Sequence, residues 1–495
     1  MNSSLPSHPI LSLGAAGRLE AKRFGGDETK EWPAMQQAGR AVAAAVLRDF
    51  QEIGGFPDNG RVLVLAGKGH NGADALVAAE SILATFPHAR AEVVFAFGDH
   101  ALRPLAHRAY RELSQAAGRR LTVRSKGEPA GRYDLCLDGL FGFSFAPPVG
   151  PEVAVLLDHV NQLPIRLRAA VDLPSAGLFR ADFTYATGSV KEPLLTDPNA
   201  GRIRYLDLGF FAGAEKGRNR VLSASLLASL AGLRPAGIDK RTQGHLLVVG
   251  GSRSYPGAVL MTVLSALRSG VGLVTAFVPE SLAPAFAARA PEAMWVGWPE
   301  TSEGGLALEG RYLLQARLDR ANAIVIGPGI GREAETYALV ADLAETTRLP
   351  MLLDADALQP DLVRAAKGPL VLTPHAGEFA RIAKTVELRE YARRRKATVV
   401  LKGPFTRISD GESVYYSFFG GPVLARGGSG DLLAGLIGGL LAQTPRDPAL
   451  AAGRGAVWHG IAADLLARAH GQAAVQTTQL LDFLSLALRE SRDEP

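Results

Sequence analysis

The sequence has a single cysteine, Cys136, among its 495 residues. One cysteine excludes an internal disulfide framework and any zinc site built on several cysteines, which fits a reducing compartment. Long hydrophobic runs are also missing, because no stretch reaches the ~18 continuous apolar residues of a membrane span, and the N-terminal segment lacks a basic start followed by an apolar run. We therefore expect a cytoplasmic protein that binds no membrane.

Charge of one sign does not gather in blocks either. The formal net charge is +5, but Lys and Arg are spread along the chain, so the composition suits anionic small molecules and does not indicate nucleic acid. The P-loop pattern G-x-x-x-x-G-K-[ST] is absent, which argues against nucleotide-driven motors and GTPases. With 47% apolar and 21% charged residues, the chain resembles ordinary globular proteins, and its length predicts two or three domains.

The stretch ARGGSGDLLAG, residues 425–435, is the clearest chemical motif. Gly427, Gly428 and Gly430 leave the backbone open ahead of an apolar helix, and the first N–H groups of such a helix bind anions. Asp431 places a carboxylate beside a phosphate bound there, where it would accept a proton from a hydroxyl group that attacks the phosphate. The alternative is a helix cap followed by an acid that has no catalytic role.

A short strand pattern, RVLVLA, covers residues 61–66 and leads into GKGHNGAD and then a helix pattern. Gly67, Gly69 and Gly72 match the G-x-G-x-x-G pattern of dinucleotide-binding turns in its required setting. A dehydrogenase would also need an acid at the end of the next strand, and Asp99 occupies that place. A dehydrogenase therefore stays open as an alternative.

Two further predicted strands, in YDLCLDGL and RAAVDLPS, end in Asp138 and Asp172. Open α/β sheets bind their ligands at such strand ends, although either acid could instead cap a helix. The segments GKGHNGADALVAA, DGLFGFSF and VDLPS, in this order after an AGRAVA helix, resemble the epimerase family that interconverts the two forms of hydrated NADH and NADPH. The resemblance covers residues 15–215 and implies a Rossmann-like three-layer α/β domain, which we place at residues 1–225.

The resemblance to the epimerases also implies roles for individual residues. Asp172 corresponds to the catalytic acid beside the reacting carbon, and Asn71, Asp138 and Ser175 to the ligands of a potassium ion, which suits their oxygen atoms. The residues implied to contact the hydrated dinucleotide are His70, Asn71, Gly72, Ala73, Asp74, Gly142, Phe143, Ser144, Phe145, Ala146, Pro147, Pro148 and Asp172.

The glycine turn departs from the usual epimerase sequence. His70, Ala73 and Ala75 replace an asparagine and two glycines, and the loop after Ser175 is shorter. The added methyl groups are expected to crowd a backbone that should approach the ligand. Because the cation ligands and the strand-end acid survive, we expect an epimerase activity that is retained but reduced.

Residues 218–244 pass from a helical pattern to a connector rich in Pro, Gly and charge, which predicts a domain boundary between residues 225 and 240. Helix and strand patterns then alternate to the end of the chain, which predicts a second three-layer α/β domain. Gly327, Gly329 and Gly331 follow one of its strands and would let backbone come close to a ligand.

Polar residues follow the other predicted strands of this half. We favour helix capping for Asp354 and Asp356, with an approach to Mg²⁺ through water as the alternative. His375 lies in TPHAGE, at a strand end where a lone histidine is usually a core or loop residue. Lys402, with Thr406 nearby, is a cation directed at phosphate, and an ordinary surface lysine is the alternative.

The second half resembles the family of nucleotide-dependent dehydratases that repair hydrated NADH and NADPH. The resemblance is carried by these motifs, in this order: GHLLVVGGS with PGAVL, VIGPGIG, LDADAL, LTPHAGEF, VVLKGPFT and GGSGDLLAG. This family has a ribokinase-like three-layer α/β fold, and the match covers residues 235–490. The resemblance implies ADP, with ATP as the alternative, and Mg²⁺. It implies hydrated dinucleotide at Ala258, Gly329, His375 and Asp431, and ADP at Lys402, Gly403, Pro404, Phe405, Thr406 and Gly430.

Together the two resemblances predict a repair enzyme that is both isomerase and lyase. Residues 1–225 would equilibrate the two epimers of the hydrate, and residues 226–495 would phosphorylate the ring hydroxyl and eliminate it. The alternative is a vitamin or sugar kinase of the same fold, with a non-catalytic dinucleotide-binding module in its first half. We expect small-molecule partners only, namely the hydrates and ADP, and a homo-oligomer whose size the sequence does not give.

Overall fold

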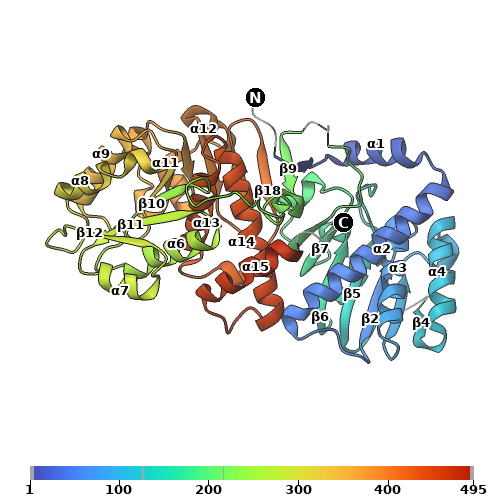
Figure 1. Ribbon diagram of the computed structural model, residues 1–495. Helices are drawn as coiled ribbons and strands as arrows, with labels where there is room; N and C mark the ends of the chain where they lie inside the picture. The colour runs from blue at the N-terminus through green and yellow to red at the C-terminus, as the bar shows by residue number, and fades with distance from the viewer. Residues whose placement is uncertain (1–4, 125–127, 214, 216, 491–495) are drawn as a thin grey trace. The chain divides into compact units, whose positions relative to one another are not determined.

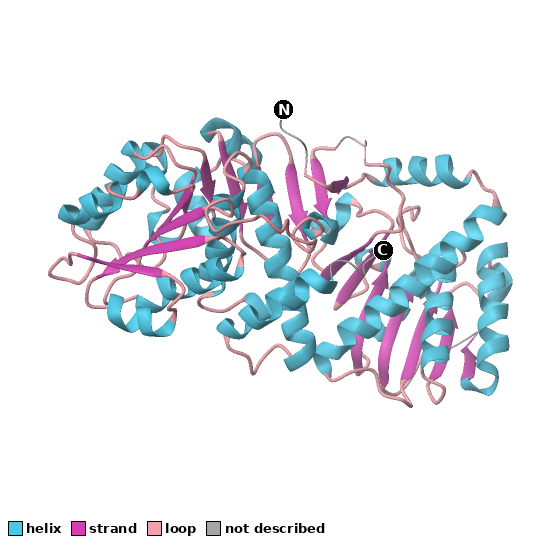
Figure 2. Cartoon of the chain, viewed as in Figure 1, coloured by secondary structure: helices cyan, strands magenta, loops and turns pink. Residues whose placement is uncertain are grey.

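The computed structural model describes residues 5–124, 128–213, 215 and 217–490. The chain divides into two compact units, whose main segments are His8–Gly217 and Arg218–Leu466. Both are layered α/β structures, with the strands of each sheet enclosed by helices (Figures 1 and 2), so the predicted fold class is confirmed. Within the described residues, every helix is too short or too polar to cross a membrane.

The sheet of the first unit is entirely parallel, with strand order β4-β3-β2-β5-β6-β7-β8. From β2 the chain adds β3 and then β4 on one side. It then returns to the other side of β2, where it adds β5, β6, β7 and β8 in turn. The strands are β2 (Arg61–Ala66), β3 (Arg90–Phe95), β4 (Leu121–Arg124), β5 (Tyr133–Gly139), β6 (Ile165–Val171), β7 (Phe183–Thr187) and β8 (Arg202–Leu206).

Helices cover both faces of this sheet. Alternate residues of β2 enter different cores: Val62 and Val64 pack toward α2, α3 and α4, whereas Leu63 and Leu65 pack toward α5. This period of two is what a strand buried on both faces requires. In Figure 1, α2, α3 and α4 lie side by side over one face. The helices are α1 (Leu13–Phe24), α2 (Glu28–Phe50), α3 (His70–Thr85), α4 (Pro104–Ala117) and α5 (Pro151–Gln162).

The larger sheet has the order β1-β9-β18-β17-β16-β15-β14-β13-β10-β11-β12 among the described residues. The strands from β16 to β12 in this order are parallel, whereas β17 is antiparallel to both of its neighbours. The strands are β1 (Ser7–Pro9), β9 (Asn219–Leu222), β10 (His245–Val249), β11 (Leu273–Pro279), β12 (Met294–Trp298), β13 (Ala323–Ile326), β14 (Met351–Leu353), β15 (Leu370–Leu372), β16 (Ala397–Leu401), β17 (Thr406–Ser409) and β18 (Val414–Ser417).

Two helices pack very closely on one face of this sheet. A Cβ atom at Gly435 of α13 would lie 2.0 Å from the carbonyl oxygen of Thr262 of α6, so only glycine allows this contact. The helices are α6 (Pro256–Arg268), α7 (Ala283–Arg289), α8 (Arg311–Gln315), α9 (Ala334–Thr346), α10 (Pro360–Ala365), α11 (Ala376–Ala383), α12 (Leu388–Arg395), α13 (Ser429–Gln443), α14 (Pro448–His470) and α15 (Leu480–Glu490).

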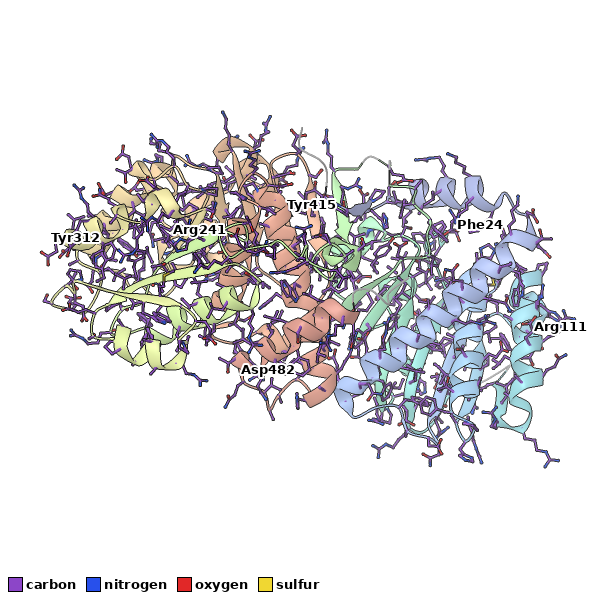
Figure 3. The ribbon with its side chains drawn as sticks, in the orientation of Figure 1. Phe24, Arg111, Arg241, Tyr312, Tyr415 and Asp482 are labelled. Carbon is purple, nitrogen blue, oxygen red and sulfur yellow. The ribbon has the colours of Figure 1, made fainter. Side chains whose placement is uncertain are left out.

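Strand β9 pairs with β18 of the larger sheet, so residues on the N-terminal side of position 225 contribute to the second sheet. The assignment of one function to residues 1–225 and another to residues 226–495 stays a prediction. Figure 3 shows side chains throughout both units, and the labelled Tyr415 of β18 is 2% exposed.

Candidate functional sites

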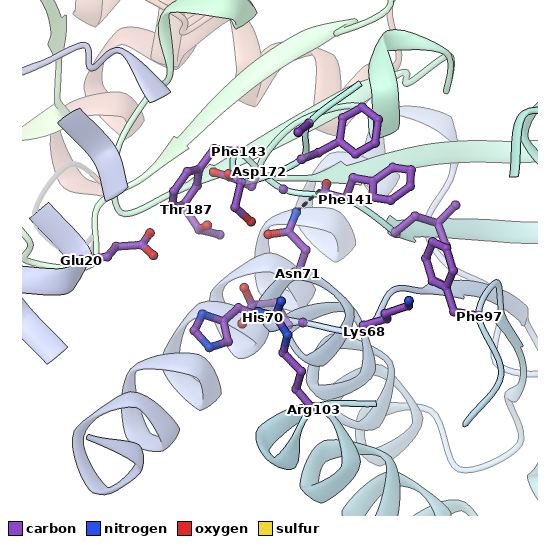
Figure 4. A pocket seen from close by; sticks show the side chains of 17 residues that line it. Glu20, Lys68, His70, Asn71, Phe97, Arg103, Phe141, Phe143, Asp172 and Thr187 are labelled. Carbon is purple, nitrogen blue, oxygen red and sulfur yellow. Dashed lines mark hydrogen bonds between the residues drawn. The ribbon is translucent and has the colours of Figure 1, made fainter. Parts of the chain in front are cut away.

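The first candidate site lies at the carboxyl ends of β2 and β5, where the direction of strand connection reverses. Open α/β sheets bind ligands at this point. A cavity of about 360 Å³ occupies it (Figure 4), and two chain segments form most of its wall. One is the turn from Lys68 to Asn71, and the other is the loop from Leu140 to Ala146.

The three glycines of the turn, Gly67, Gly69 and Gly72, differ in how much space a side chain would have. A Cβ atom at Gly67 would lie 2.0 Å from the carbonyl oxygen of Leu140, and one at Gly72 would lie 2.3 Å from that of Gly67. Gly69 has more room, because the nearest atom to its Cβ position is an Arg103 nitrogen at 3.9 Å. Two glycines therefore serve backbone packing, and the third leaves space on the cavity side.

Most residues predicted to contact the dinucleotide line this cavity. Those that do are His70, Asn71, Asp74, Gly142, Phe143, Ser144, Phe145, Ala146 and Asp172. Gly72 and Ala73 are buried in the first turn of α3, and Ala73 and Ala75 belong to the hydrophobic core. The methyl groups of Ala73 and Ala75 therefore pack in the core, and neither residue is among the described residues that line the cavity. Asp99, the acid of the dehydrogenase alternative, is likewise outside the described lining.

The three predicted potassium ligands meet around the backbone of Phe141. Asn71 donates its side-chain amide to the carbonyl oxygens of Phe141 (2.9 Å) and Val171 (2.8 Å). The Ser175 hydroxyl accepts the Phe141 N–H (3.0 Å) and donates to Asp138 (2.6 Å). Asp138 also accepts the Ser175 N–H, and burial raises its pKa to about 6.

Asp172 lies at the end of β6, in the left-handed region at φ 67°, which is uncommon for residues other than glycine. Its carboxylate pairs with the Lys191 ammonium, and the two residues are 2% and 1% exposed. Burial raises the pKa of Asp172, and Lys191 opposes that shift. Sequence reasoning missed Lys191, because nothing in TGSVKEP marks this lysine as buried.

A second cavity of about 410 Å³ shares part of its lining with the first, including Glu20, Asp74 and Thr187. Its other walls come largely from α1 and α2; they include apolar side chains such as Met35 and the carboxylate of Glu31. Phe24, labelled in Figure 3, lies at the end of α1 and also lines it. Sequence reasoning missed this space, because the segments that line it are far apart in the sequence and only the fold brings them together.

The second candidate site combines residues from the ends of three strands and the start of α13. Lys402 follows β16, Asp354 follows β14, and Asp431 lies in the first turn of α13. His375 follows β15 and forms a parallel bridge with Lys402. The Lys402 N–H donates to the Pro374 carbonyl oxygen at 2.8 Å, which holds the two loops together.

The charges of this site are strongly coupled. The Lys402 ammonium lies 3.1 Å from the Asp354 carboxylate, whose side chain is 2% exposed. Burial lowers the pKa of Lys402, but Asp354, Glu378 and Asp431 outweigh it and the net shift is upward. Burial raises the pKa of Asp431 to about 6; the negative charge of Asp354 adds to this shift, and Lys402 opposes it.

Two interpretations favoured from sequence are corrected here. Asp354 makes no capping bond; its carboxylate binds Lys402 and the Thr373 hydroxyl (2.7 Å). Asp356 does not cap a helix either, since it pairs with the exposed Arg332 at 2.9 Å. Sequence separation explains the error, because Asp354 and Lys402 are 48 residues apart and only the fold brings them together.

His375 has a structural role that its lone position did not reveal. Its ring accepts the N–H groups of Gly377 and Glu378 at the start of α11, and the Glu378 carboxylate accepts the His375 N–H at 2.8 Å. This reciprocal capping box fixes the loop beside Lys402. The side chain of His375 is 60% exposed, so the same ring remains accessible to a ligand.

Close packing of glycines brings the remaining predicted residues together. A Cβ atom at Gly329 would lie 2.4 Å from the Tyr255 carbonyl oxygen and 3.1 Å from the Ala258 Cβ. One at Gly430 would lie 3.1 Å from the Lys402 ammonium. Gly430 therefore leaves open the space between the α13 N-terminus and the partly exposed Lys402 ammonium, which is where an anion would bind.

The rest of the predicted nucleotide-binding loop follows Lys402. Gly403 and Pro404 connect β16 to β17, and Thr406 is the first residue of β17. Phe405 packs edge-on against Phe418, with ring centroids 5.4 Å apart. These observations place the loop next to the cation.

Comparisons with known proteins agree with both halves of this description. The family described as NAD(P)H-hydrate dehydratase matches residues 246–485, and the family described as YjeF-related protein N-terminus matches residues 33–192. The bifunctional NAD(P)H-hydrate repair enzyme of Moorella thermoacetica is 34% identical, with 93% of each chain covered. That of Gloeobacter violaceus is 38% identical, with 97% of each covered. The ADP/ATP-dependent NAD(P)H-hydrate dehydratase of Bacillus subtilis, co-crystallised with ATP/Mg²⁺, is 29% identical; 54% of this chain and 97% of that one are covered, with a TM-score of 0.47.

Proposed function

This chain belongs to the family of bifunctional NAD(P)H-hydrate repair enzymes, and from that membership we propose how its two units divide the repair of hydrated NADH and NADPH. The first unit interconverts the two epimers of the hydrate. The second uses ADP to remove water from the epimer that it accepts. One observation carries the proposal: Asp431, Lys402 and Asp354 converge at the open N-terminus of α13.

The charges of the second site suit a dehydration that proceeds through phosphorylation. Asp431 takes the proton of the ring hydroxyl as that oxygen attacks the terminal phosphate of ADP. The new phosphate ester is a better leaving group than hydroxide. Its departure, with a proton from the neighbouring carbon, restores the dihydropyridine ring. The N–H groups of α13 and the Lys402 ammonium stabilise the charge on the transferring phosphate.

The nucleotide and its metal fit the residues present. Lys402 to Thr406 and Gly430 would hold the ADP phosphates, since a cation and a helix N-terminus face the space that a side chain at Gly430 would fill. Mg²⁺ is bound mostly through phosphate oxygens and one or two carboxylates, and Asp354 would be the carboxylate that holds it here, since Asp431 serves as the base. When bound, Mg²⁺ neutralises phosphate charge. Ala258, Gly329 and His375 would then contact the hydrated ring.

The first site suits epimerisation with a bound potassium ion. Asp138 is fully buried, and the described residues supply N–H and O–H donors to it but no cationic side chain. A monovalent cation held by Asp138, Asn71 and Ser175 would offset this charge, and their oxygen atoms are suitable ligands. The segments His70–Asp74 and Gly142–Pro148 would contact the hydrated dinucleotide, with Asp172 beside its reacting carbon.

The decisive experiment follows both epimers of hydrated NADH in the full chain by chromatography, with the recovered NADH measured by absorbance. ADP with Mg²⁺ should restore NADH from both epimers, and the same reaction with ATP measures the nucleotide preference. Without nucleotide, the epimers should equilibrate faster than they do spontaneously. A stable phosphorylated alcohol in place of NADH would instead identify a kinase. Light scattering of the same sample tests the expected homo-oligomer.

A further inference from the structure

Three carboxylates line the first cavity, and the buried Lys191 ammonium lies beside one of them. Asp172 pairs with Lys191, whereas Asp74, 8% exposed, and the half-buried Glu20 have no ion-pair partner among the described side chains. Burial raises the pKa of all three carboxyl groups, and the positive charge of Lys191 opposes each shift.

Glu20 is the member of this group whose proton is exchangeable at neutral pH. Burial raises its pKa to about 7, Lys191 opposes the shift, and Asp172 and Glu31 add to it. Burial also raises the pKa of Asp74 well above its usual range, and the negative charges of Asp172 and Glu20 add to this shift. The charged or titratable groups around Glu20 are Asp172 with its partner Lys191, Asp74 and His70 of α3, Glu31 of α2, and Arg103 ahead of α4.

The position of Glu20 is as informative as its charge. It projects from α1 into the cavity that Asp172 enters from the end of β6, and Figure 4 shows both side chains at the same end of the cavity, with Thr187 near them. Glu20 also lines the second cavity, whereas Asp172 lines only the first. A dinucleotide that occupies both spaces would pass Glu20 where the two cavities join.

We propose that Glu20 is a second catalytic residue of the epimerisation, a general acid that works with Asp172 as the base. This inference rests on the proposed epimerase function. The carbon that is inverted carries the hydroxyl group and is bonded to the ring nitrogen. Its configuration changes only if a bond to that carbon breaks and reforms on the other face, and both events move protons.

The proton transfers balance within this pair of carboxyl groups. Asp172 removes the hydroxyl proton, the oxygen electrons form a carbonyl bond, and the carbon–nitrogen bond breaks. The electron pair of that bond stays on nitrogen, which takes the proton of Glu20. After rotation about the adjacent carbon–carbon bond, nitrogen attacks the other face of the carbonyl. It returns its proton to Glu20, and the new hydroxyl takes the proton held by Asp172.

The test uses the full chain without nucleotide, so that only epimerisation occurs, and follows both epimers of hydrated NADPH across a range of pH. In the unmodified protein the rate should fall as the pH rises through about 7, because Glu20 loses the proton that it must donate. Glu20→Gln should lower kcat at least ~100-fold, leave KM within about threefold, and abolish this decline. Glu20→Asp should restore part of kcat together with the decline.

Glu80→Gln is the matched control, since Glu80 is a carboxylate of α3 in the same unit and lines neither cavity. It should keep kcat within about threefold and leave the decline at the same pH. A folded Glu20→Gln protein that keeps its kcat, or loses kcat while the decline persists, overturns the role of Glu20. An unmodified protein no faster than the spontaneous reaction overturns the epimerase function itself.

Discussion

Replacing Asp431 with asparagine tests the base that the dehydration requires. The substitution keeps the shape of the side chain and the Lys402–Asp354 pair, so ADP affinity should change only a few-fold. Removing a general base costs about 10²–10⁴ in rate, which corresponds to about 3–5 kcal/mol of transition-state stabilisation. We therefore expect kcat for NADH recovery to fall at least ~100-fold.

The pH dependence gives this prediction a second, independent measurement. Burial and the charge of Asp354 raise the pKa of Asp431 to about 6. A base acts in its ionised form, so its contribution is present above this value and is lost as the pH falls through it. About 90% of the side chain is ionised at pH 7 and about 10% at pH 5, so kcat should fall roughly ninefold between them. The residual rate of Asp431→Asn should not follow this curve.

The assay is the absorbance of recovered NADH with saturating ADP and Mg²⁺, at each pH and for both proteins. Thermal unfolding of the variant shows whether it is folded, and ADP binding by calorimetry shows whether the nucleotide site is intact. Near-normal turnover in a folded Asp431→Asn protein would refute the assignment of the base. A large loss accompanied by lost ADP binding would place Asp431 in nucleotide binding instead.

Three further predictions follow from single contacts. Lys402→Ala should raise the apparent KM for ADP at least ~tenfold with a smaller change in kcat, since a charge-assisted contact is worth about 1.5–3 kcal/mol. Arg332→Ala, which removes an exposed ion pair, is the control. An unchanged KM for ADP in Lys402→Ala would contradict the role of Lys402. Asp138→Asn should slow epimerisation and remove its dependence on the cation, which replacement of K⁺ by Li⁺ measures in the unmodified protein; equal rates in both salts would exclude a potassium site. Gly435→Ala should lower the free energy of unfolding by at least ~2 kcal/mol, because the added Cβ would meet a carbonyl oxygen at 2.0 Å. Gly257→Ala, where a Cβ would meet open space, should change the free energy of unfolding by about 0.5 kcal/mol or less. Urea denaturation that gives equal free energies for the two variants would contradict this packing.

Much of the fold follows from local pattern. The strand in RVLVLA forms as predicted, because a short, continuous apolar run fits a strand that is buried on both faces. The helix that carries the AGRAVA segment begins well before it, at Glu28, where Asp27 caps it by accepting the Thr29 N–H. Patterns of this kind depend on residues that are close in the sequence, so the sequence alone predicts such helices and strands.

The chemistry of the sites follows only in part. Asp431, Asp138 and Asp172 could be predicted as site residues because sequence marks strand ends and helix starts, and topology brings such ends to one edge of the sheet. The roles of Lys191 and Glu20 depend on burial, which comes from packing with distant segments. The same holds for Asp354, whose carboxylate meets its ammonium partner only in the folded protein.

The two sites share an electrostatic arrangement that neither motif alone would indicate. In the second site one ammonium, Lys402, faces Asp354 and other carboxylates, and Asp431 is left with a pKa of about 6. In the first site Lys191 faces its own group of carboxylates, and Glu20 is left with a pKa of about 7. Burial, together with neighbouring carboxylates whose charge one ammonium does not offset, therefore raises the pKa of one acid in each site into the range where protons exchange at neutral pH. The two pKa values explain why one acid acts as a base and the other as an acid. Asp431 is mostly ionised at pH 7 and can accept a proton, whereas Glu20 is about half protonated and can donate one.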